Sequence, residues 1–273
     1  MKAVVCKRYG SPEVLELSNV ATPEPKSDEL RIAIKATAVN SADWRLRKPD
    51  PWLVRLFFGL RKPKKSILGS SLAGIVDQVG ANVSRFKKGD EVFGLSGADV
   101  LGAYAEYVCL KETAPIARKP SNISFTEAAV IPFGAHTAWY LLNKAGIAKG
   151  QKILIYGASG AVGTAAVQLA KYFGANVTAV CSTSNVDLLK TLGADQVIDY
   201  HREDVSSSMA TYDLIFETVN KASVPMLLEH LDKDGKLILG AALLKEMLQG
   251  AFAHLTKRGH VVFGVNEGML FSE

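Results

Sequence analysis

Three glycines at a fixed spacing are the residues of this chain whose chemistry is most readily interpreted. Gly157, Gly160 and Gly163 follow the apolar run Ile153–Tyr156 and open an alanine-rich amphipathic stretch that ends at Tyr172. Glycine permits a tight turn from strand to helix, close approach of backbone to phosphate, and close helix–strand packing. The N–H groups at the helix start would face the phosphates. The spacing G-x-x-G-x-x-G therefore predicts a pyrophosphate-binding turn; an ordinary tight turn is the alternative.

The residues that follow this turn favour the first interpretation, because short apolar runs alternate with helical periods to the end of the chain. The expected strands are Ile153–Tyr156, Val177–Val180, Gln196–Asp199, Asp213–Glu217, Lys236–Gly240 and His260–Val265. The expected helices lie around Asn185–Leu192, Lys221–Leu231 and Ala241–Leu255. Strands joined by crossover helices form a doubly wound parallel sheet, here of six strands, which binds ligands at the carboxyl ends of its strands. The glycine turn and the segments Cys181–Asn185, Tyr200 and Thr218–Asn220 would meet there.

The first part of the chain has a different pattern, with short strands separated by turn signals. The expected strands are Lys2–Cys6, Leu30–Ala38, Gly74–Val79, Glu91–Phe93 and Ala105–Cys109. This pattern predicts a β-rich, partly open barrel. Ser121–Ser124 is typical of a linker and helix cap before a helical stretch over Phe125–Asn143. We therefore expect one domain over residues 1–121 and a nucleotide-binding domain over residues 122–273.

Composition excludes several classes of protein. The net charge of +5 is modest, and the densest basic cluster, Arg61–Lys65, is short, which argues against nucleic-acid binding. Three scattered cysteines are too few for a disulfide framework or a four-cysteine zinc site. The N-terminus does not resemble a signal peptide, and no apolar run reaches the ~18 residues that span a bilayer. The expected location is cytoplasmic.

Several motifs occur in a recognisable order along the chain. They are Val39–Trp44 (V-N-x-x-D-W), Ile67–Gly74 (L-G-x-D-x-A-G, with Ser71 in place of the acid), Gly102–Val108 (G-G-x-A-E-Y) and Pro132–Trp139 (P-x-A-G-x-T-A-W, with Gly134 and Ala135 reversed). Together they resemble the quinone oxidoreductase branch of the medium-chain dehydrogenase/reductase superfamily. The resemblance implies a GroES-like β-rich domain followed by a Rossmann domain. It also implies hydride transfer from NADPH to a quinone or an α,β-unsaturated carbonyl.

Zinc alcohol dehydrogenases of the same superfamily carry a cysteine near Asn40 and a histidine–glutamate pair near Ser70 and Ser71. Asparagine and serine are poor zinc ligands, so the resemblance favours a metal-free reductase. Asn40 is then the candidate for orienting the substrate or the nicotinamide, with Asp43 in a supporting role. The alternative for Asp43 is that it caps a helical turn that begins at Trp44.

The candidates for cofactor binding are thirteen residues: Thr137, Gly157, Ala158, Ser159, Gly160, Ala161, Val162, Gly163, Ser182, Thr183, Asn185, Tyr200 and Val219. NAD-binding units usually place an acid after the second strand, whereas here no acid occurs until Asp187. The hydroxyls of Ser182 and Thr183 could donate to a 2′-phosphate, although no Lys or Arg stands in that loop. We expect NADPH in preference to NADH. His201 and Arg202 either add charge beside the adenine or form a solvated strand end.

Two further expectations concern the surface and the chain end. The apolar stretch Pro51–Leu60 would cover a lipophilic acceptor, form local core or, less favoured, contact a membrane surface. Family members continue for about sixty residues beyond Glu273, so we expect a truncated or partial sequence. The resemblance places His260–Val265 at a homodimer interface. An active reductase and a catalytically impaired NADPH-binding or interaction protein are the two functions that remain.

Overall fold

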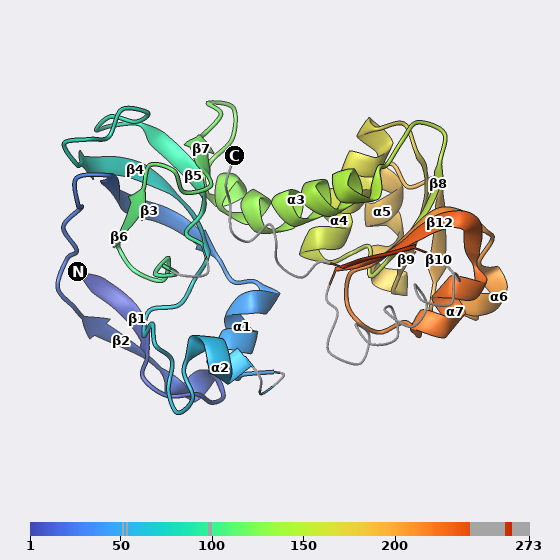
Figure 1. The fold of residues 1–273 in the computed structure, drawn as a ribbon, viewed down its shortest axis with the longest axis horizontal. Helices are drawn as coiled ribbons and strands as arrows, with labels where there is room; N and C mark the ends of the chain where they lie inside the picture. Colours follow the sequence, from blue (N-terminus) through green and yellow to red (C-terminus); the bar gives the residue numbers. More distant parts are fainter. Residues whose placement is uncertain (51, 53, 98–99, 241–259, 264–273) are drawn as a thin grey trace. The chain divides into compact units, whose positions relative to one another are not determined.

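The computed structural model describes residues 1–273 except 51, 53, 98–99, 241–259 and 264–273 (Figure 1). It divides the chain into two compact units, of which one covers Met1–Phe133 and the other begins at Gly134. The division falls inside helix α3 (Phe125–Ala145), which carries Pro132 in its interior. The helix expected over Phe125–Asn143 is therefore confirmed, while the domain boundary at residue 121 stays a prediction.

The first unit is built on an antiparallel five-stranded sheet. Its strands lie in the order β6 (Tyr107–Lys111), β3 (Glu29–Ala38), β4 (Ser71–Val79), β5 (Glu91–Leu95) and β7 (Ile116–Arg118). A two-stranded sheet pairs β1 (Lys2–Cys6) with β2 (Leu15–Asn19), and the helices are η1 (Pro12–Val14), α1 (Ser41–Arg47) and α2 (Val54–Phe58). The β-rich class is confirmed, but β6 begins at Tyr107 rather than Ala105, which forms only an isolated bridge to Ala3.

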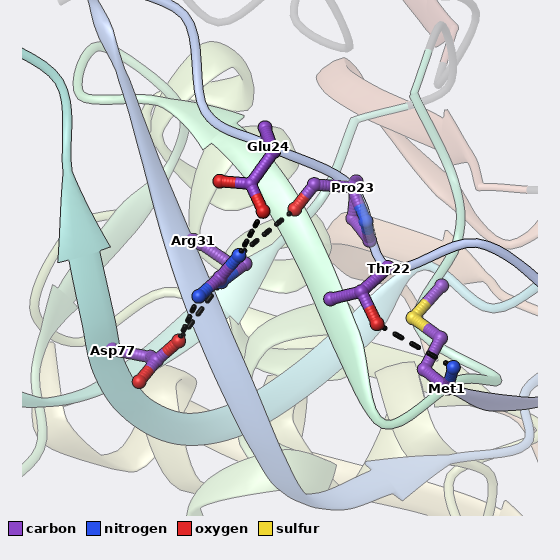
Figure 2. A network of polar contacts seen from close by, with 6 residues as sticks. All are labelled: Met1, Thr22, Pro23, Glu24, Arg31 and Asp77. Atoms are coloured by element: carbon purple, nitrogen blue, oxygen red, sulfur yellow. Dashed lines mark hydrogen bonds and ion pairs between the residues drawn. The ribbon is translucent and has the colours of Figure 1, made fainter.

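Buried aliphatic side chains from alternate positions of these strands form the core of the first unit, among them Leu30, Ile32, Leu72, Val76 and Leu110. Arg31, which points away from that core on β3, donates to Asp77 Oδ2 on β4 at 2.6 and 2.8 Å and to Glu24 Oε1 at 2.9 Å (Figure 2). The guanidinium thus ties two strands and the preceding loop together on the outer face of the sheet.

The second unit contains a parallel six-stranded sheet, as the strand pattern predicts. Its order is β10 (Gln196–Asp199), β9 (Asn176–Cys181), β8 (Lys152–Tyr156), β11 (Tyr212–Glu217), β12 (Leu231–Leu239) and β13 (His260–Phe263). The helical elements after the strands are α4 (Ala161–Tyr172), η2 (Thr183–Asn185), α5 (Val186–Thr191), α6 (Val205–Ser208) and α7 (Val224–Glu229). The strand order reverses between β8 and β11, which is the switch point at which such sheets bind ligands.

Both faces of this sheet are covered, because neighbouring residues of each strand point to opposite sides. Ile153 and Ile155 of β8 pack with α3 and α4 on one face, and Leu154 packs with α7 on the other. Continuous apolar strands are what a sheet buried on both faces requires.

The helix expected over Lys221–Leu231 is shorter, because α7 ends at Glu229 and Leu231 already pairs with Tyr212 as the first residue of β12. The helix expected over Ala241–Leu255 lies outside the described residues, as do positions 264 and 265 of the last expected strand.

Cys6, Cys109 and Cys181 form no disulfides. Burial raises the pKa of each thiol, to about 11 for Cys109, so all three are protonated at neutral pH. Within the described residues, no helix combines the length and the apolar character needed to cross a bilayer.

Candidate functional site

The glycine turn joins the end of β8 at Tyr156 to the start of α4 at Ala161. Gly157 has a φ of +77°, and a Cβ there would lie 2.6 Å from Cγ1 of Val219. A Cβ on Gly163 would lie 2.6 Å from Cα of Ala158. At Gly160, by contrast, a Cβ would meet only the Gly157 carbonyl oxygen, at 3.5 Å. Two glycines therefore allow close packing, and the third leaves open space in front of the helix.

The N-terminus of α4 faces this open space. Gly160 is the N-cap residue, with extended backbone, and supplies no side-chain cap. The first N–H groups of a helix have no acceptor within it, and they carry the positive end of the helix dipole. Ala161, Val162 and Gly163 form this first turn, and they are all among the predicted residues. Ala158 is fully buried, and its N–H donates to the Val180 carbonyl at 3.1 Å.

A second loop closes against the glycine turn from the end of β11. Thr218 Oγ1 donates to the carbonyl oxygens of Tyr156 and Gly157 at 2.9 and 3.1 Å, which sets Val219 beside Gly157. The structure thus brings the predicted residue Val219 to the glycine turn. Both loops lie at the switch point of the sheet.

Glu217 organises this second loop, a role that the motifs of the sequence do not predict. Its buried carboxylate accepts the N–H groups of Val219, Asn220 and Lys221 at 3.3, 2.6 and 3.0 Å. Asn220 has a φ of +57°, which lets the successive N–H groups converge. Burial raises the pKa of Glu217, and these N–H groups oppose the rise. An acid at the end of an otherwise apolar strand is the signal that marks such a residue.

The serine-rich turn after β9 forms a small hydrogen-bonded cluster. Asn185 Nδ2 donates to Ser182 Oγ at 2.9 Å, and the Ser182 and Ser184 hydroxyls lie 3.3 Å apart. Thr183 is exposed at the start of η2. The predicted residues of this turn therefore do lie together, with hydroxyl and amide groups at the surface.

Tyr200 follows the neighbouring strand β10 and joins the same edge. Its N–H donates to the Cys181 carbonyl at 3.1 Å, and its half-exposed ring lies 4.6 Å from the His201 ring, centroid to centroid. The carboxyl ends of β8, β9, β10 and β11 thus gather the glycine turn, the serine-rich turn, Tyr200 and Val219. This is the arrangement expected of a dinucleotide site.

Thr137 lies on α3, half-buried, next to His136, whose pKa is lowered by burial. A Cβ on Gly134 would collide with the Ala161 carbonyl group, so this part of α3 packs closely on the start of α4. Residues three apart share a helix face, which puts Thr137 on the same side of α3 as Gly134.

In the first unit, Asn40 and Asp43 form a capping box at the start of α1. Asn40 Oδ1 accepts the Ala42 N–H at 3.0 Å, and Asp43 Oδ2 accepts the Asn40 N–H at 2.9 Å. The helix begins at Ser41, so the expected start at Trp44 is wrong. The structure supports the capping alternative for Asp43 and extends it to Asn40.

Asp43 is almost fully buried, at 3% exposure, and burial raises its pKa. The Asn40 N–H and the Tyr104 hydroxyl oppose this rise. Burial of its hydroxyl raises the pKa of the partly buried Tyr104, and the charge of Asp43 raises it further. Neither Asp43 Oδ1 nor the Tyr104 hydroxyl has a hydrogen bond of ordinary geometry within the described residues. The Asp43 carboxyl and the Tyr104 phenol therefore influence each other's pKa.

The two positions that hold zinc ligands in the alcohol dehydrogenases are linked to each other here. Asn40 Nδ2 donates to Ser70 Oγ at 3.0 Å. Ser71 is fully buried, and its hydroxyl has no hydrogen-bond partner in the described part of the chain. In the same described part, no group of three His, Cys, Asp or Glu residues is arranged to hold a metal ion.

Comparisons with known proteins agree with this geometry. Residues 26–121 match the profile of the alcohol dehydrogenase GroES-like domain, and residues 161–273 match that of the zinc-binding dehydrogenases. A 2-methylene-furan-3-one reductase from Solanum lycopersicum is 40% identical over 230 residues, which are 81% of this chain and 58% of the relative. The chain thus spans little more than half the length of that relative.

A quinone-oxidoreductase homolog from Spinacia oleracea, described as chloroplastic, is 37% identical over 251 residues. These cover 87% of this chain and 74% of the relative. Among solved structures, the quinone oxidoreductase of Escherichia coli complexed with NADPH superposes with a TM-score of 0.79 at 25% identity, over 98% of this chain and 81% of that one.

Proposed function

Because the chain belongs to the medium-chain dehydrogenase/reductase superfamily, with quinone and enone oxidoreductases among its relatives, we propose that it reduces a quinone or an α,β-unsaturated carbonyl with NADPH. The observation that carries this proposal is the glycine turn, with open space at Gly160 in front of an uncapped helix N-terminus. Such a turn suits a pyrophosphate.

The residues of the second unit fit a nicotinamide dinucleotide. N–H groups of Ala161–Gly163 would bind the diphosphate, and Val219 and Thr137 would contact the nicotinamide side. NADPH, when bound, supplies a hydride. Quinones and enones are already electrophilic, so the chain's own contribution is to position the acceptor and to donate hydrogen bonds to its developing oxyanion.

The preference for NADPH over NADH rests on the serine-rich turn. Ser182, Thr183 and Asn185 offer hydroxyl and amide donors to a 2′-phosphate, and the exposed Arg202 guanidinium follows Tyr200 at the same edge. The solved relative with NADPH supports the same assignment.

We further propose that hydride transfer here needs no zinc, because the Asn40–Ser70 hydrogen bond joins two side chains that are poor zinc ligands. The Asn40 amide has two N–H donors, of which one goes to Ser70. The second would orient the carbonyl oxygen of the acceptor. Asp43 then acts as a positioning residue, because it accepts the backbone N–H of Asn40.

Two finer proposals concern the oligomeric state and the cellular location of the protein. The edge strand β13 would pair two copies into a homodimer, as the family resemblance implies. The cytoplasmic location stays a prediction, because the spinach relative is described as chloroplastic.

The test is a spectrophotometric assay with purified protein, NADPH or NADH, and 1,4-benzoquinone, 9,10-phenanthrenequinone or a simple enone. Acceptor-dependent oxidation that prefers NADPH, unchanged by a chelator, is the expected result. Tight NADPH binding without turnover would instead favour the alternative, a catalytically impaired NADPH-binding or interaction protein. Loss of activity with chelator, restored by zinc, would overturn the metal-free proposal.

A further inference from the structure

The strand after the serine-rich turn brings an acid to it. Asp199 is the last residue of β10, and its Cα is paired with that of Cys181, the last residue of β9. The Tyr200 N–H bond to the Cys181 carbonyl holds the two strand ends together. Asp199 therefore lies beside the Ser182–Asn185 turn, although fourteen or more residues separate them in sequence.

The Asp199 carboxylate is held in its charged form. The Thr183 hydroxyl is the largest cause of a lowered pKa, and the His201 N–H, which donates to Oδ1 at 3.0 Å, adds to it. The side chain is 8% exposed. Its buried Oδ2 lies 3.4 Å from Arg202 Nε, without a hydrogen bond of ordinary geometry in the described chain.

An acid in this part of a Rossmann unit bears on the cofactor. In NAD-binding units the acid follows the second strand, where it accepts the ribose 2′-OH and repels a 2′-phosphate. Here that position carries hydroxyls, and the negative charge comes from the next strand along the sheet edge. A charge one strand away, in a setting drier than water, still acts on a dianionic phosphate.

We propose that Asp199 and Arg202 together set the selectivity of this chain between NADPH and NADH. Asp199 restrains binding of the 2′-phosphate and positions Thr183, and Arg202 offsets that charge. This inference rests on the proposed function only in that a nicotinamide dinucleotide binds at the serine-rich turn.

The surroundings of Arg202 allow its guanidinium to pair either with Asp199 or with a 2′-phosphate. Its side chain is 75% exposed, so the guanidinium can leave Asp199 for a phosphate at little cost. Asp199 keeps the His201 N–H when Arg202 moves away. Glu203, the other acid nearby, has Oε1 engaged by the Asp199 N–H and Oε2 by the Ser208 hydroxyl.

The experiment measures dissociation constants of NADPH and NADH by fluorescence titration for the full chain and for Asp199→Asn and Arg202→Gln. Asparagine keeps an oxygen acceptor for Thr183 and removes the charge. We expect Asp199→Asn to raise the ratio of NADPH to NADH affinity roughly fivefold, and Arg202→Gln to lower it by a similar factor. The affinity for NADH itself should change less than about twofold in both variants.

The control is Asp232→Asn, which removes the same charge from the exposed start of β12, on the far side of the sheet from β10. Its ratio should equal that of the unaltered chain. Equal shifts for both nucleotides, or no shift in Asp199→Asn, would overturn this inference and leave the proposed function standing. Failure of the unaltered chain to bind either nucleotide would instead overturn the proposed function.

Discussion

The two units build their candidate sites from different materials. In the second unit, the candidate site consists of backbone groups. Three glycines shape the turn, the N–H groups at the start of α4 face outward, and Glu217 accepts three more N–H groups. In the first unit the motif consists of side chains, and Asn40 and Asp43 are already committed to capping α1.

Because of this difference, the two sites tolerate different amino-acid substitutions. A backbone site fails when any added atom fills the turn, whatever its chemistry. A side-chain site whose members also cap a helix can lose function and stability together, so an inactive variant alone does not reveal a catalytic role. Substitutions that keep one property and remove the other are the informative ones.

The largest effect is expected at Glu217. Replacement by alanine leaves the N–H groups of Val219, Asn220 and Lys221 without their acceptor, and should lower the free energy of unfolding by about 3 kcal/mol. NADPH affinity should fall with it, because Val219 loses its place against Gly157. Denaturant unfolding and fluorescence titration measure the two. A loss below about 1 kcal/mol would show that water replaces the carboxylate.

The conservative variant Glu217→Gln adds a pH test. The pKa of Glu217 is raised in the folded state, so its contribution to stability is fully present below the usual glutamate pKa of about 4.3. That contribution is lost as pH rises through the raised folded pKa. The unaltered chain should therefore gain stability relative to Glu217→Gln as pH falls through this window. A difference that is constant with pH would contradict the raised pKa.

Gly163 and Gly160 form a matched pair inside one turn. Gly163→Ala places a Cβ against Cα of Ala158 and should cost about 2 kcal/mol of stability. Gly160→Ala meets open space and should cost about 0.5 kcal/mol through the N-cap. Its NADPH affinity should nevertheless fall about tenfold, or about 1.4 kcal/mol. If Gly160→Ala binds NADPH normally, the space in front of α4 is not the phosphate site.

Asn40 tests the side-chain site. Asn40→Ser keeps an N-cap oxygen and should change stability by less than about 0.5 kcal/mol, whereas Asn40→Ala should cost about 1 kcal/mol. Both remove the amide, so both should lower kcat/KM about tenfold if it orients the acceptor, as one hydrogen bond is worth about 1.4 kcal/mol or less. Full activity in Asn40→Ser would leave Asn40 a capping residue only.

The smallest effect belongs to Ser71. Its fully buried hydroxyl has no partner among the described residues, so Ser71→Ala should be neutral or stabilise the chain by up to about 1 kcal/mol. Thermal unfolding measures this change in stability. The control is Ser96→Ala, which should destabilise the chain because the Ser96 hydroxyl donates to the Ser70 carbonyl at 3.3 Å. A destabilised Ser71→Ala would reveal a hydrogen bond to water.

Local pattern was enough to predict the strand, glycine turn and helix of the second unit's candidate site. The apolar run of β8, the glycine spacing and the helical period after it are contiguous, so the turn and its residues Gly157–Gly163 follow from sequence. The six parallel strands follow for the same reason. Short elements without periodicity were missed, including β2, β7, α2 and α6.

The features of the candidate sites that the sequence did not predict depend on pairing between residues far apart in the chain. The absence of an acid after β9 is correct along the chain, but the β9–β10 register brings Asp199 to that turn. The Asn40–Ser70 hydrogen bond likewise joins α1 to the start of β4, thirty residues later. Helix limits at Ser41 and Glu229 depended on a capping box and on strand pairing, neither of which periodicity reveals.

The thiols of Cys6, Cys109 and Cys181 are protonated at neutral pH. Because the thiolate is the reacting species, these three cysteines should react slowly with maleimides. A cysteine introduced at the exposed position of Ser184 would then carry a fluorophore or mass tag alone. The rate of tagging, with and without dinucleotide, would report occupancy of the serine-rich turn directly, with no need for an acceptor or for turnover.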